Sequence, residues 1–167
     1  RKIKYTRDYG VTFFEIDQPN LLQAKLAIYQ ENHIDPNAVF IGIDFVKENL
    51  LTALIEYQVS RTVPTIVLWE GSSFYLEKSD VLLILNDIKS YFMHPIITLD
   101  YMHASMQEAT HELDEAAQQS SLHQTLKTFK DSHSPFKTFF SPREMVTICQ
   151  DMGLEITEQH TAAELAT

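Results

Sequence analysis

Hydrophobic and polar positions along the chain alternate between two kinds of pattern. Four short runs are almost continuously apolar, β-branched or aromatic, as strands covered on both faces of a sheet are. These predicted strands are Val11–Ile16, Val39–Ile43, Thr65–Trp69 and Ile96–Leu99. Between them, apolar residues recur at helical spacing over Leu21–Gln30, Lys47–Tyr57 and Ser79–Phe92. The repeated alternation predicts a parallel sheet with right-handed crossovers, which is a doubly wound α/β fold.

Each predicted strand ends on or close to an acidic residue. These residues are Asp17, Asp44, Glu70 and Asp100. Ligands of doubly wound sheets bind outside the carboxyl ends of the strands. We therefore expect these acidic side chains to meet at one crevice.

The pattern changes after the fourth predicted strand. Residues 103–135 are polar, with apolar residues at helical spacing. We predict that they form an insertion or lid over the site of an acceptor substrate. The whole chain, residues 1–167, is predicted to be a single domain. The residues Ser141 to Glu144 form a capping box with proline at the first helical position. The helix that they open is predicted to run to about Met152 and to stop at Gly153. Leu154–His160 alternates as a strand does.

Composition narrows the classes of function. The net charge of -10 argues against a nucleic-acid or anionic membrane surface, because phosphates are repelled. No apolar run is long enough to span a bilayer, and no signal-peptide pattern opens the chain. The lone Cys149 suits a reducing compartment, so a cytoplasmic location is predicted. The four glycines form neither a GxGxxG motif nor a P-loop. Because residue 1 is arginine, we expect the chain to begin partway through a longer product.

Two acids in the first third of the chain are candidate ligand-binding residues. A carboxylate at the tip of a Rossmann strand accepts hydrogen bonds from ribose hydroxyls, and Asp17 is placed for this role. The alternative for Asp17, at even odds, is a helix N-cap. Asp44 and Phe45 are placed to frame a flat base with an exocyclic amine. A loop acid beside a core phenylalanine is the stronger alternative from position alone.

The segment Trp69–Leu76 is the most unusual in the chain. A strand ends in Glu70, a glycine follows that permits close backbone approach, and two aromatic residues come next. A carboxylate there suits a cationic ligand group, and we expect Glu70 to be functional and Phe74 and Leu76 to be core. The alternative is an ordinary strand-to-helix turn.

Two residues after the last predicted parallel strand are candidates for contacting an acceptor substrate. Tyr101 follows Asp100 directly, and His103 lies two residues beyond Tyr101. A structural role for His103 is the more common alternative. The seven histidines are scattered and lack metal-ligand spacing, so no metal is predicted.

Taken together, these segments resemble the leucine carboxyl methyltransferase family, in particular its bacterial branch of polyketide-type O-methyltransferases. Two elements in combination carry the resemblance, E-x-D-Q-P at residues 15–19 and E-G-x-x-x-Y-L at residues 70–76. Gly42–Phe45 and Ile97–Tyr101 support it. The resemblance runs from about Tyr9 through Met102 and then weakly from residue 136 to the end.

Membership would imply a Rossmann-like class I methyltransferase sheet and S-adenosylmethionine as the methyl donor. By motif position, Asp17 would contact the donor's ribose, while Asp44 and Phe45 would frame its adenine. Glu70 would lie near the methionine moiety. Tyr75 would lie near the methyl-transfer site, with His103 as a second catalytic candidate. The family's first strand and glycine-rich donor loop would precede Arg1.

Three functions follow from this reading. The first is an O-methyltransferase acting on a carboxylate or hydroxyl of a small molecule or peptide. The second is a non-catalytic scaffold that keeps the fold without binding the donor. The third is a nicotinamide-dependent dehydrogenase, which the Glu70–Gly71 segment makes the weakest of the three. The sequence does not fix the oligomeric state.

Overall fold

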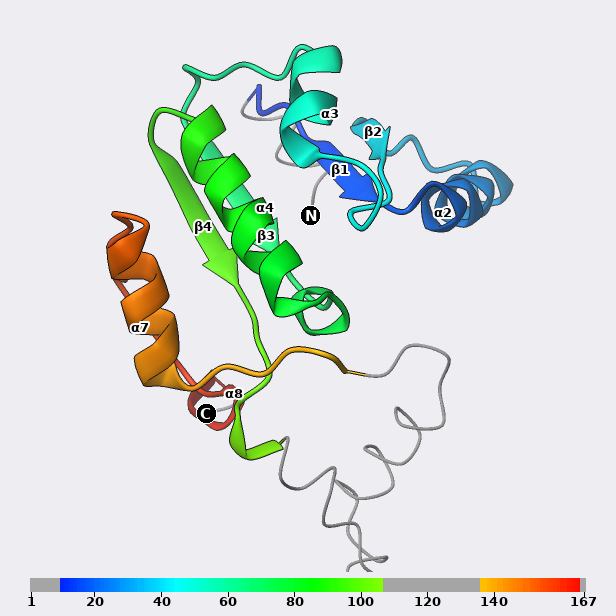
Figure 1. Ribbon diagram of the computed structural model, residues 1–167. Coiled ribbons are helices and arrows are strands. Elements are labelled where there is room, and N and C mark those ends of the chain that lie inside the picture. The colour runs from blue at the N-terminus through cyan, green and yellow to red at the C-terminus, as the bar shows by residue number, and fades with distance from the viewer. Residues whose placement is uncertain (1–9, 107–135, 166–167) are drawn as a thin grey trace, which may run out of the picture. The chain divides into compact units, whose positions relative to one another are not determined.

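The computed structural model describes residues 10–106 and 136–165 and has a mixed α/β architecture (Figure 1). Contacts along the backbone divide the chain into two compact units, residues 1–61 and 62–167. In the described residues the strands form one parallel pair in each unit. The predicted strand–helix alternation is therefore present, as two separate two-stranded sheets.

The first unit is built on the parallel strands β1 (Phe14–Asp17) and β2 (Val39–Gly42). Helix α2 (Pro19–Glu31) connects them, and α3 (Leu50–Glu56) follows β2. The strands pair along their whole length, with Asp17 opposite Gly42. Their carboxyl ends therefore lie at the same edge. The buried side chains of this unit are Leu22, Ile41, Ile43, Leu50, Ala53, Leu54 and Val59.

The second unit is built on the parallel strands β3 (Thr65–Trp69) and β4 (Pro95–Leu99). A short 3-10 helix, η1 (Ser73–Tyr75), and helix α4 (Lys78–Tyr91) connect them. Beyond β4 lie α7 (Pro142–Asp151) and the short α8 (Ala162–Leu165). A single parallel bridge joins His103 to Phe140.

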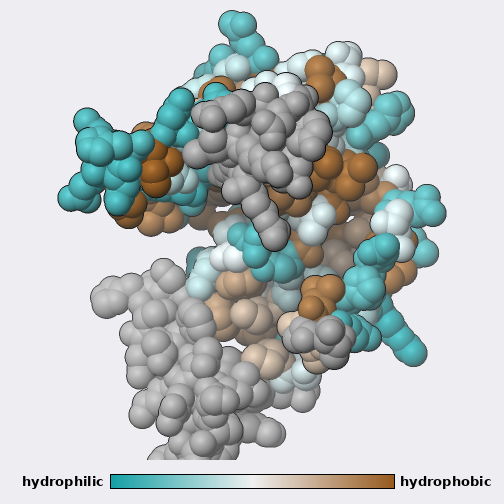
Figure 2. Space-filling view, turned by 180° about the vertical axis from the view of Figure 1, so that it is seen from behind, coloured by the Kyte–Doolittle hydropathy of each residue, from teal (hydrophilic) through white to brown (hydrophobic). Residues whose placement is uncertain are grey.

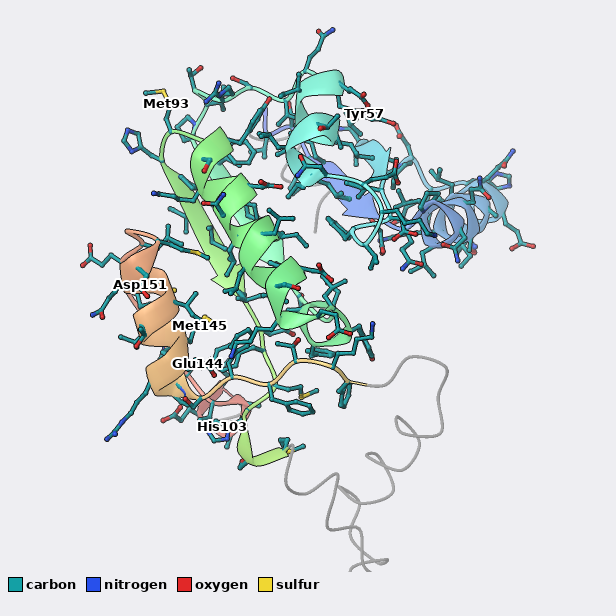
Figure 3. All side chains as sticks on the ribbon, in the orientation of Figure 1. Tyr57, Met93, His103, Glu144, Met145 and Asp151 are labelled. Atoms are coloured by element: carbon teal, nitrogen blue, oxygen red, sulfur yellow. The ribbon has the colours of Figure 1, made fainter. Side chains whose placement is uncertain are left out.

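One hydrophobic cluster organises the second unit. Its buried members come from α4, from the segment before α7 and from α7 itself: Val81, Leu85, Phe140 and Met145. Alternate residues of the strands, Trp69, Ile97 and Leu99, pack against it. Met145 lies on the sheet side of α7 in Figure 3. Full burial of one hydrophobic side chain of this kind stabilises the folded state by about 1.5–3 kcal/mol.

The predicted cap of α7 is confirmed. The hydroxyl of Ser141 accepts a hydrogen bond from the Glu144 backbone N–H at 3.2 Å, and Pro142 occupies the first helical position. The helix ends at Asp151, and Gly153 has a φ of 69°. Glycine adopts this left-handed conformation readily, which explains the stop.

One predicted strand is absent, and most other elements begin or end within three residues of their predicted bounds. The predicted strand at Leu154–His160 is wrong, because these residues contain no strand. Alternation alone does not make a strand without a neighbour to pair with, and this segment instead contributes Ile156 to the hydrophobic cluster. The first strand begins at Phe14 rather than Val11, because its pairing with β2 begins there.

The predicted lid, residues 103–135, lies outside the described residues apart from residues 103–106. In the part of the chain that the structure describes, no helix has both the length and the apolar character needed to cross a bilayer.

Candidate functional site

Asp17 ends β1 with a half-buried carboxylate. Its Oδ1 accepts the neighbouring Gln18 N–H at 2.7 Å. Gln18 is the N-cap of α2 and makes no side-chain capping bond. The N-cap alternative for Asp17 is therefore wrong. An ionised carboxylate has about four acceptor positions, so this contact leaves capacity for hydroxyl donors.

Gly42 explains how the start of α2 approaches the end of β2. A Cβ at position 42 would lie 3.3 Å from the Pro19 Cγ and 3.4 Å from its Cα. A side chain at position 42 would therefore require Pro19 to shift by a few tenths of an ångström. The glycine thus keeps the carboxyl end of β2 close to the helix that begins two residues after Asp17.

Asp44 stands just beyond β2 and already has local partners. Its carboxylate pairs with Lys47 at 2.7 Å and accepts the Val46 N–H at 3.1 Å. The hydrogen bond from Lys47, supported by that from Val46, lowers the pKa of Asp44. The carboxylate is therefore an ionised acceptor in a tight loop. Phe45 beside it is half-buried.

The other acid of the first motif has a structural role. Glu15 forms an ion pair with Lys25 of α2, and the Glu15 side chain is only 12% exposed. This hydrogen bond raises the pKa of Lys25, whose ammonium also lies 6.0 Å from the Tyr29 ring centroid. The pair ties β1 to α2 beside Asp17. Within E-x-D-Q-P, Glu15 thus stabilises the fold, and Asp17 is the candidate ligand-binding residue.

Glu70 begins a turn that is held by hydrogen bonds to Asp100, the residue after the neighbouring strand β4. The Gly71 N–H donates to both carboxylate oxygens of Asp100 at 3.0 Å. The Ser73 hydroxyl, which is buried, donates to the Asp100 carbonyl at 2.6 Å. Gly71 has a φ of 73°, which favours glycine at this position. The turn thus holds the exposed Glu70 at the carboxyl end of β3.

Tyr75 lies in an aromatic cluster that sequence patterns did not reveal. Its ring centroid is 4.8 Å from that of Phe74 and 5.5 Å from that of Phe136. Phe74 and Phe136 meet edge to face at 5.1 Å. Phe74 and Leu76 are half-buried, so neither is fully buried as the expected core role requires, and only Leu76 packs against the hydrophobic cluster. Phe136 is more than sixty residues away in sequence, so no local pattern indicated this contact.

The segment 136–140 attaches this cluster to the rest of the unit. The Lys137 N–H donates to the Phe74 carbonyl at 2.8 Å, and the buried Thr138 hydroxyl donates to the Leu76 carbonyl at 2.5 Å. Further along, the Phe140 N–H donates to the Met102 carbonyl at 2.9 Å. One segment therefore contacts both the loop of Tyr75 and the loop of His103.

His103 lies beyond β4 (Figure 3), and its ring is exposed and internally bonded. The Ser105 N–H donates to Nδ1 at 3.1 Å, and the Ser105 hydroxyl lies 2.7 Å from the same atom. An N–H donor requires a lone pair on Nδ1, so the neutral ring carries its proton on Nε2. The acceptor nitrogen of the ring is therefore already engaged. Tyr101 likewise accepts from the Gln159 amide at 2.6 Å.

The candidate residues thus form two groups. Asp17, Asp44 and Phe45 share the carboxyl edge of the β1–β2 pair. Glu70, Tyr75 and His103 lie beyond the carboxyl ends of β3 and β4. The convergence of both groups on one ligand stays a prediction.

Two surface depressions lie elsewhere. One, of about 580 Å³, surrounds the end of α7 and includes Cys149 and Ile156. The other, of about 240 Å³, lies between Gly42 and Tyr57 along α3. Neither is lined by a predicted site residue. Among the described residues, no three His, Cys, Asp or Glu side chains gather as metal ligands.

Comparison with known proteins gives one match. The family described as leucine carboxyl methyltransferase matches residues 2–89, which is more than half of the chain and includes both candidate motifs. No curated protein and no solved structure matches. The match implies methyltransferase activity and does not favour the scaffold alternative. The chain belongs to the leucine carboxyl methyltransferase family.

Proposed function

We propose that the protein is an S-adenosylmethionine-dependent O-methyltransferase. The observation that carries the proposal is the set of acids at the carboxyl ends of parallel strands, in a chain of this family. Asp17 receives the ribose hydroxyls, because its carboxylate is half-buried at a strand tip. Asp44 and Phe45 frame the adenine, and Glu70 receives the donor's ammonium group.

The pairing of the strands supports a doubly wound, Rossmann-like sheet. In the classic order 3-2-1-4-5-6, strands 2 and 3 are neighbours, and strands 4 and 5 are neighbours. With β1 and β2 as strands 2 and 3, and β3 and β4 as strands 4 and 5, this order contains the two parallel pairs found in the described residues. The crevice for the donor in that order lies at the carboxyl ends that carry the acids.

The hydrogen bonds around His103 and Tyr101 favour a carboxylate as the methyl acceptor. The donor supplies an activated methyl group on sulfur, so the protein's task is to align the acceptor oxygen in line. Alignment of this kind lowers a barrier by about 7–11 kcal/mol. An alcohol or phenol also needs a general base within hydrogen-bond reach. The acceptor atoms of both candidate bases are engaged with Ser105 and Gln159, whereas a carboxylate needs no base.

Tyr75 is proposed to form a wall of the methyl-transfer site. Its ring is held by Phe74 and Phe136, which fixes its position before an acceptor arrives. The two motifs around Asp17 and Glu70 also support placement in the bacterial polyketide-type branch. Residues 103–135 are proposed to cover the acceptor within one domain of residues 1–167.

Calorimetric titration of the intact protein with S-adenosylmethionine tests donor binding. We expect saturable binding that weakens at least about tenfold in Asp17→Ala, because tenfold corresponds to 1.4 kcal/mol, the scale of one hydrogen bond to a charged group. Glu31→Ala, an exposed acid at the far end of α2, is the matched control. Absence of binding, or equal binding by both variants, contradicts the proposal.

The acceptor class is tested with a donor carrying a labelled methyl group. The probe is a short peptide that ends in leucine with a free carboxylate, and its C-terminal amide is the control. We expect label on the acid alone, released as methanol by mild alkali, since esters hydrolyse and ethers do not. Alkali-stable label, or equal transfer to the amide, contradicts a carboxylate acceptor.

A further inference from the structure

The loop that carries Asp44 follows the end of the β1–β2 pair and leads to α3 (Figure 1). Hydrogen bonding between the two strand ends continues as far as Ile43, whose N–H donates to the Asp17 carbonyl at 3.0 Å. Ile43 is buried, and Asp44 is the next residue. Because Asp44 lies beyond the strand, its position depends on contacts within the loop.

Glu48 contacts both polar groups of the Asp44 backbone. The Asp44 N–H donates to Oε2 of Glu48 at 2.8 Å. In the other direction, the Glu48 N–H donates to the Asp44 carbonyl at 2.8 Å, and the Lys47 N–H donates to the same carbonyl at 2.9 Å. Hydrogen bonds to an ionised acceptor are roughly twice as strong as those to a neutral one. Glu48 therefore closes the loop on the residue that precedes it by four positions.

Helix α3 in turn fixes the position of Glu48. The next residue, Asn49, is the N-cap of α3, and its side chain accepts the Thr52 N–H at 3.1 Å. Leu50, the first residue of the helix, is buried. Contacts thus lead from the core of the first unit, through the helix cap and Glu48, to the backbone of Asp44.

This arrangement leaves the carboxylate of Asp44 able to bind a ligand. Its oxygens accept the Val46 N–H and pair with Lys47, which uses two of about four acceptor positions. The two hydrogen bonds with Glu48 involve the backbone of Asp44, so they fix the carboxylate without occupying it. Beside the loop, Gly42, Ile43 and Glu48 line part of the depression of about 240 Å³.

We propose that Glu48 is a positioning residue that gives the donor site its preference for adenine. By holding the backbone of Asp44, Glu48 places the Asp44 carboxylate where it accepts a hydrogen bond from the 6-amino group of the base. A purine with a carbonyl at that position presents a second acceptor, which the carboxylate repels. Since adenine at Asp44 is itself part of the proposed function, this role of Glu48 rests on that function.

Two ligands that differ only in the base test this role. They are S-adenosylhomocysteine and its counterpart with a carbonyl in place of the 6-amino group. Calorimetry of the intact protein gives a dissociation constant for each, and we expect the wild type to bind the adenine compound at least about tenfold more tightly. Glu48→Ala should reduce this ratio at least about threefold, because the Asp44 carboxylate is no longer held in place. A loss of stability alone weakens both ligands equally and leaves the ratio unchanged.

Two variants are matched to Glu48→Ala. Glu48→Gln keeps a side-chain oxygen that can accept the Asp44 N–H, so it should restore most of the preference for adenine. The chain has a net charge of -10, and hydrophilic residues, in teal, lie at many places on the surface in Figure 2. The loss of one exposed acid is therefore a small change in surface character. Glu56→Ala measures that change, because Glu56 is an exposed acid at the end of α3, and its ratio should equal that of the wild type.

The Asp44 amide signal reports the hydrogen bond to Glu48 in the absence of ligand. In NMR spectra, we expect Glu48→Ala to move this signal to higher field and to speed its hydrogen exchange, whereas Glu56→Ala should change neither. An unchanged Asp44 signal, or a base preference equal to that of the wild type, overturns the role of Glu48 while binding of S-adenosylhomocysteine still supports the proposed function. Failure of the wild type to bind either ligand overturns the proposed function, and the role of Glu48 with it.

Discussion

The Gly71 N–H donates to both carboxylate oxygens of Asp100, so the turn after β3 is anchored on the residue after β4. Glu70 is the residue immediately before the anchored amide. The position of Glu70 thus depends on Asp100, which holds the backbone of the next residue, Gly71. The sequence indicated Asp100 only as an acid at the end of a strand. The structure shows that Asp100 positions the turn that begins at Glu70.

Replacement of this anchor should weaken the fold. Asp100→Ala removes a charge-assisted acceptor and is expected to lower the free energy of unfolding by about 1–2 kcal/mol. Urea denaturation measures the change. Asp151→Ala is the control, because Asp151 is an exposed acid at the C-terminal end of α7, where a negative charge is unfavourable. Asp151→Ala should leave stability unchanged or raise it slightly, and equal losses in both variants would contradict the role of Asp100.

The ion pair between β1 and α2 makes a second prediction. Lys25→Met removes the ammonium group that pairs with the Glu15 carboxylate, which is only 12% exposed. Since the Lys25 side chain is itself 42% exposed, we expect a loss of about 1 kcal/mol rather than the value for a buried pair. Lys47→Met is the control, because that ion pair has a lysine that is 78% exposed, and it should leave stability almost unchanged.

The same pair should respond to alkaline pH. The hydrogen bond that Lys25 donates to Glu15 raises the pKa of Lys25 above its usual value of 10.5. The native state therefore holds this proton more tightly than the unfolded state, and the stabilisation is complete below that pH. It is lost as the pH rises through the raised pKa of Lys25. The stability difference between the wild type and Lys25→Met, measured by urea titration, should shrink above pH 10.5, and a difference that grows there would contradict the assignment.

The buried hydroxyl of Thr138 makes a fourth prediction. It donates to the Leu76 carbonyl and closes the segment 136–140 onto the loop of Tyr75. Thr138→Val keeps the shape and leaves that carbonyl without its hydroxyl donor, at an expected cost of about 1–3 kcal/mol. Thr138→Ser keeps the hydroxyl and should cost less. Near-ultraviolet circular dichroism should also show weaker aromatic signals in Thr138→Val alone, and identical spectra and stabilities would argue against this link.

Cys149 should react slowly with thiol reagents. Burial raises the pKa of its thiol, so less of the reactive thiolate is present at neutral pH. We expect modification by a chromogenic disulfide reagent to be slower in the native protein than in urea. Equal rates would show that Cys149 is not packed against the hydrophobic cluster of the second unit.

The sequence predicted the regular elements because each rests on a local pattern. Thr65–Trp69 was predicted with the bounds that the structure has, and the α7 cap followed from Ser141 and Pro142. Leu154–His160 shows the limit of such patterns. A strand needs a neighbour, and alternation of side chains does not reveal whether one is present.

The candidate site was only partly accessible to the same reasoning. Asp17, Asp44 and Glu70 were found because strand ends can be read from sequence. The contacts that hold the candidate residues could not be predicted, because their partners lie far away in the sequence. Asp100 is 29 residues from Gly71, and Phe136 is about twice as far from Tyr75. Glu15 was recognised as part of a motif, and only its ion pair with Lys25 showed that it stabilises the fold.

The proposed donor site is tested most directly by an amide-resolved NMR titration of the intact protein with S-adenosylhomocysteine, the stable product of the donor. If one ligand contacts the ends of β1, β2 and β3, as we propose, signals of Gln18, Asp44 and Gly71 will shift together with a single dissociation constant. Shifts confined to one of these strand ends, or centred on α7, would contradict it, as would a spectrum that does not change.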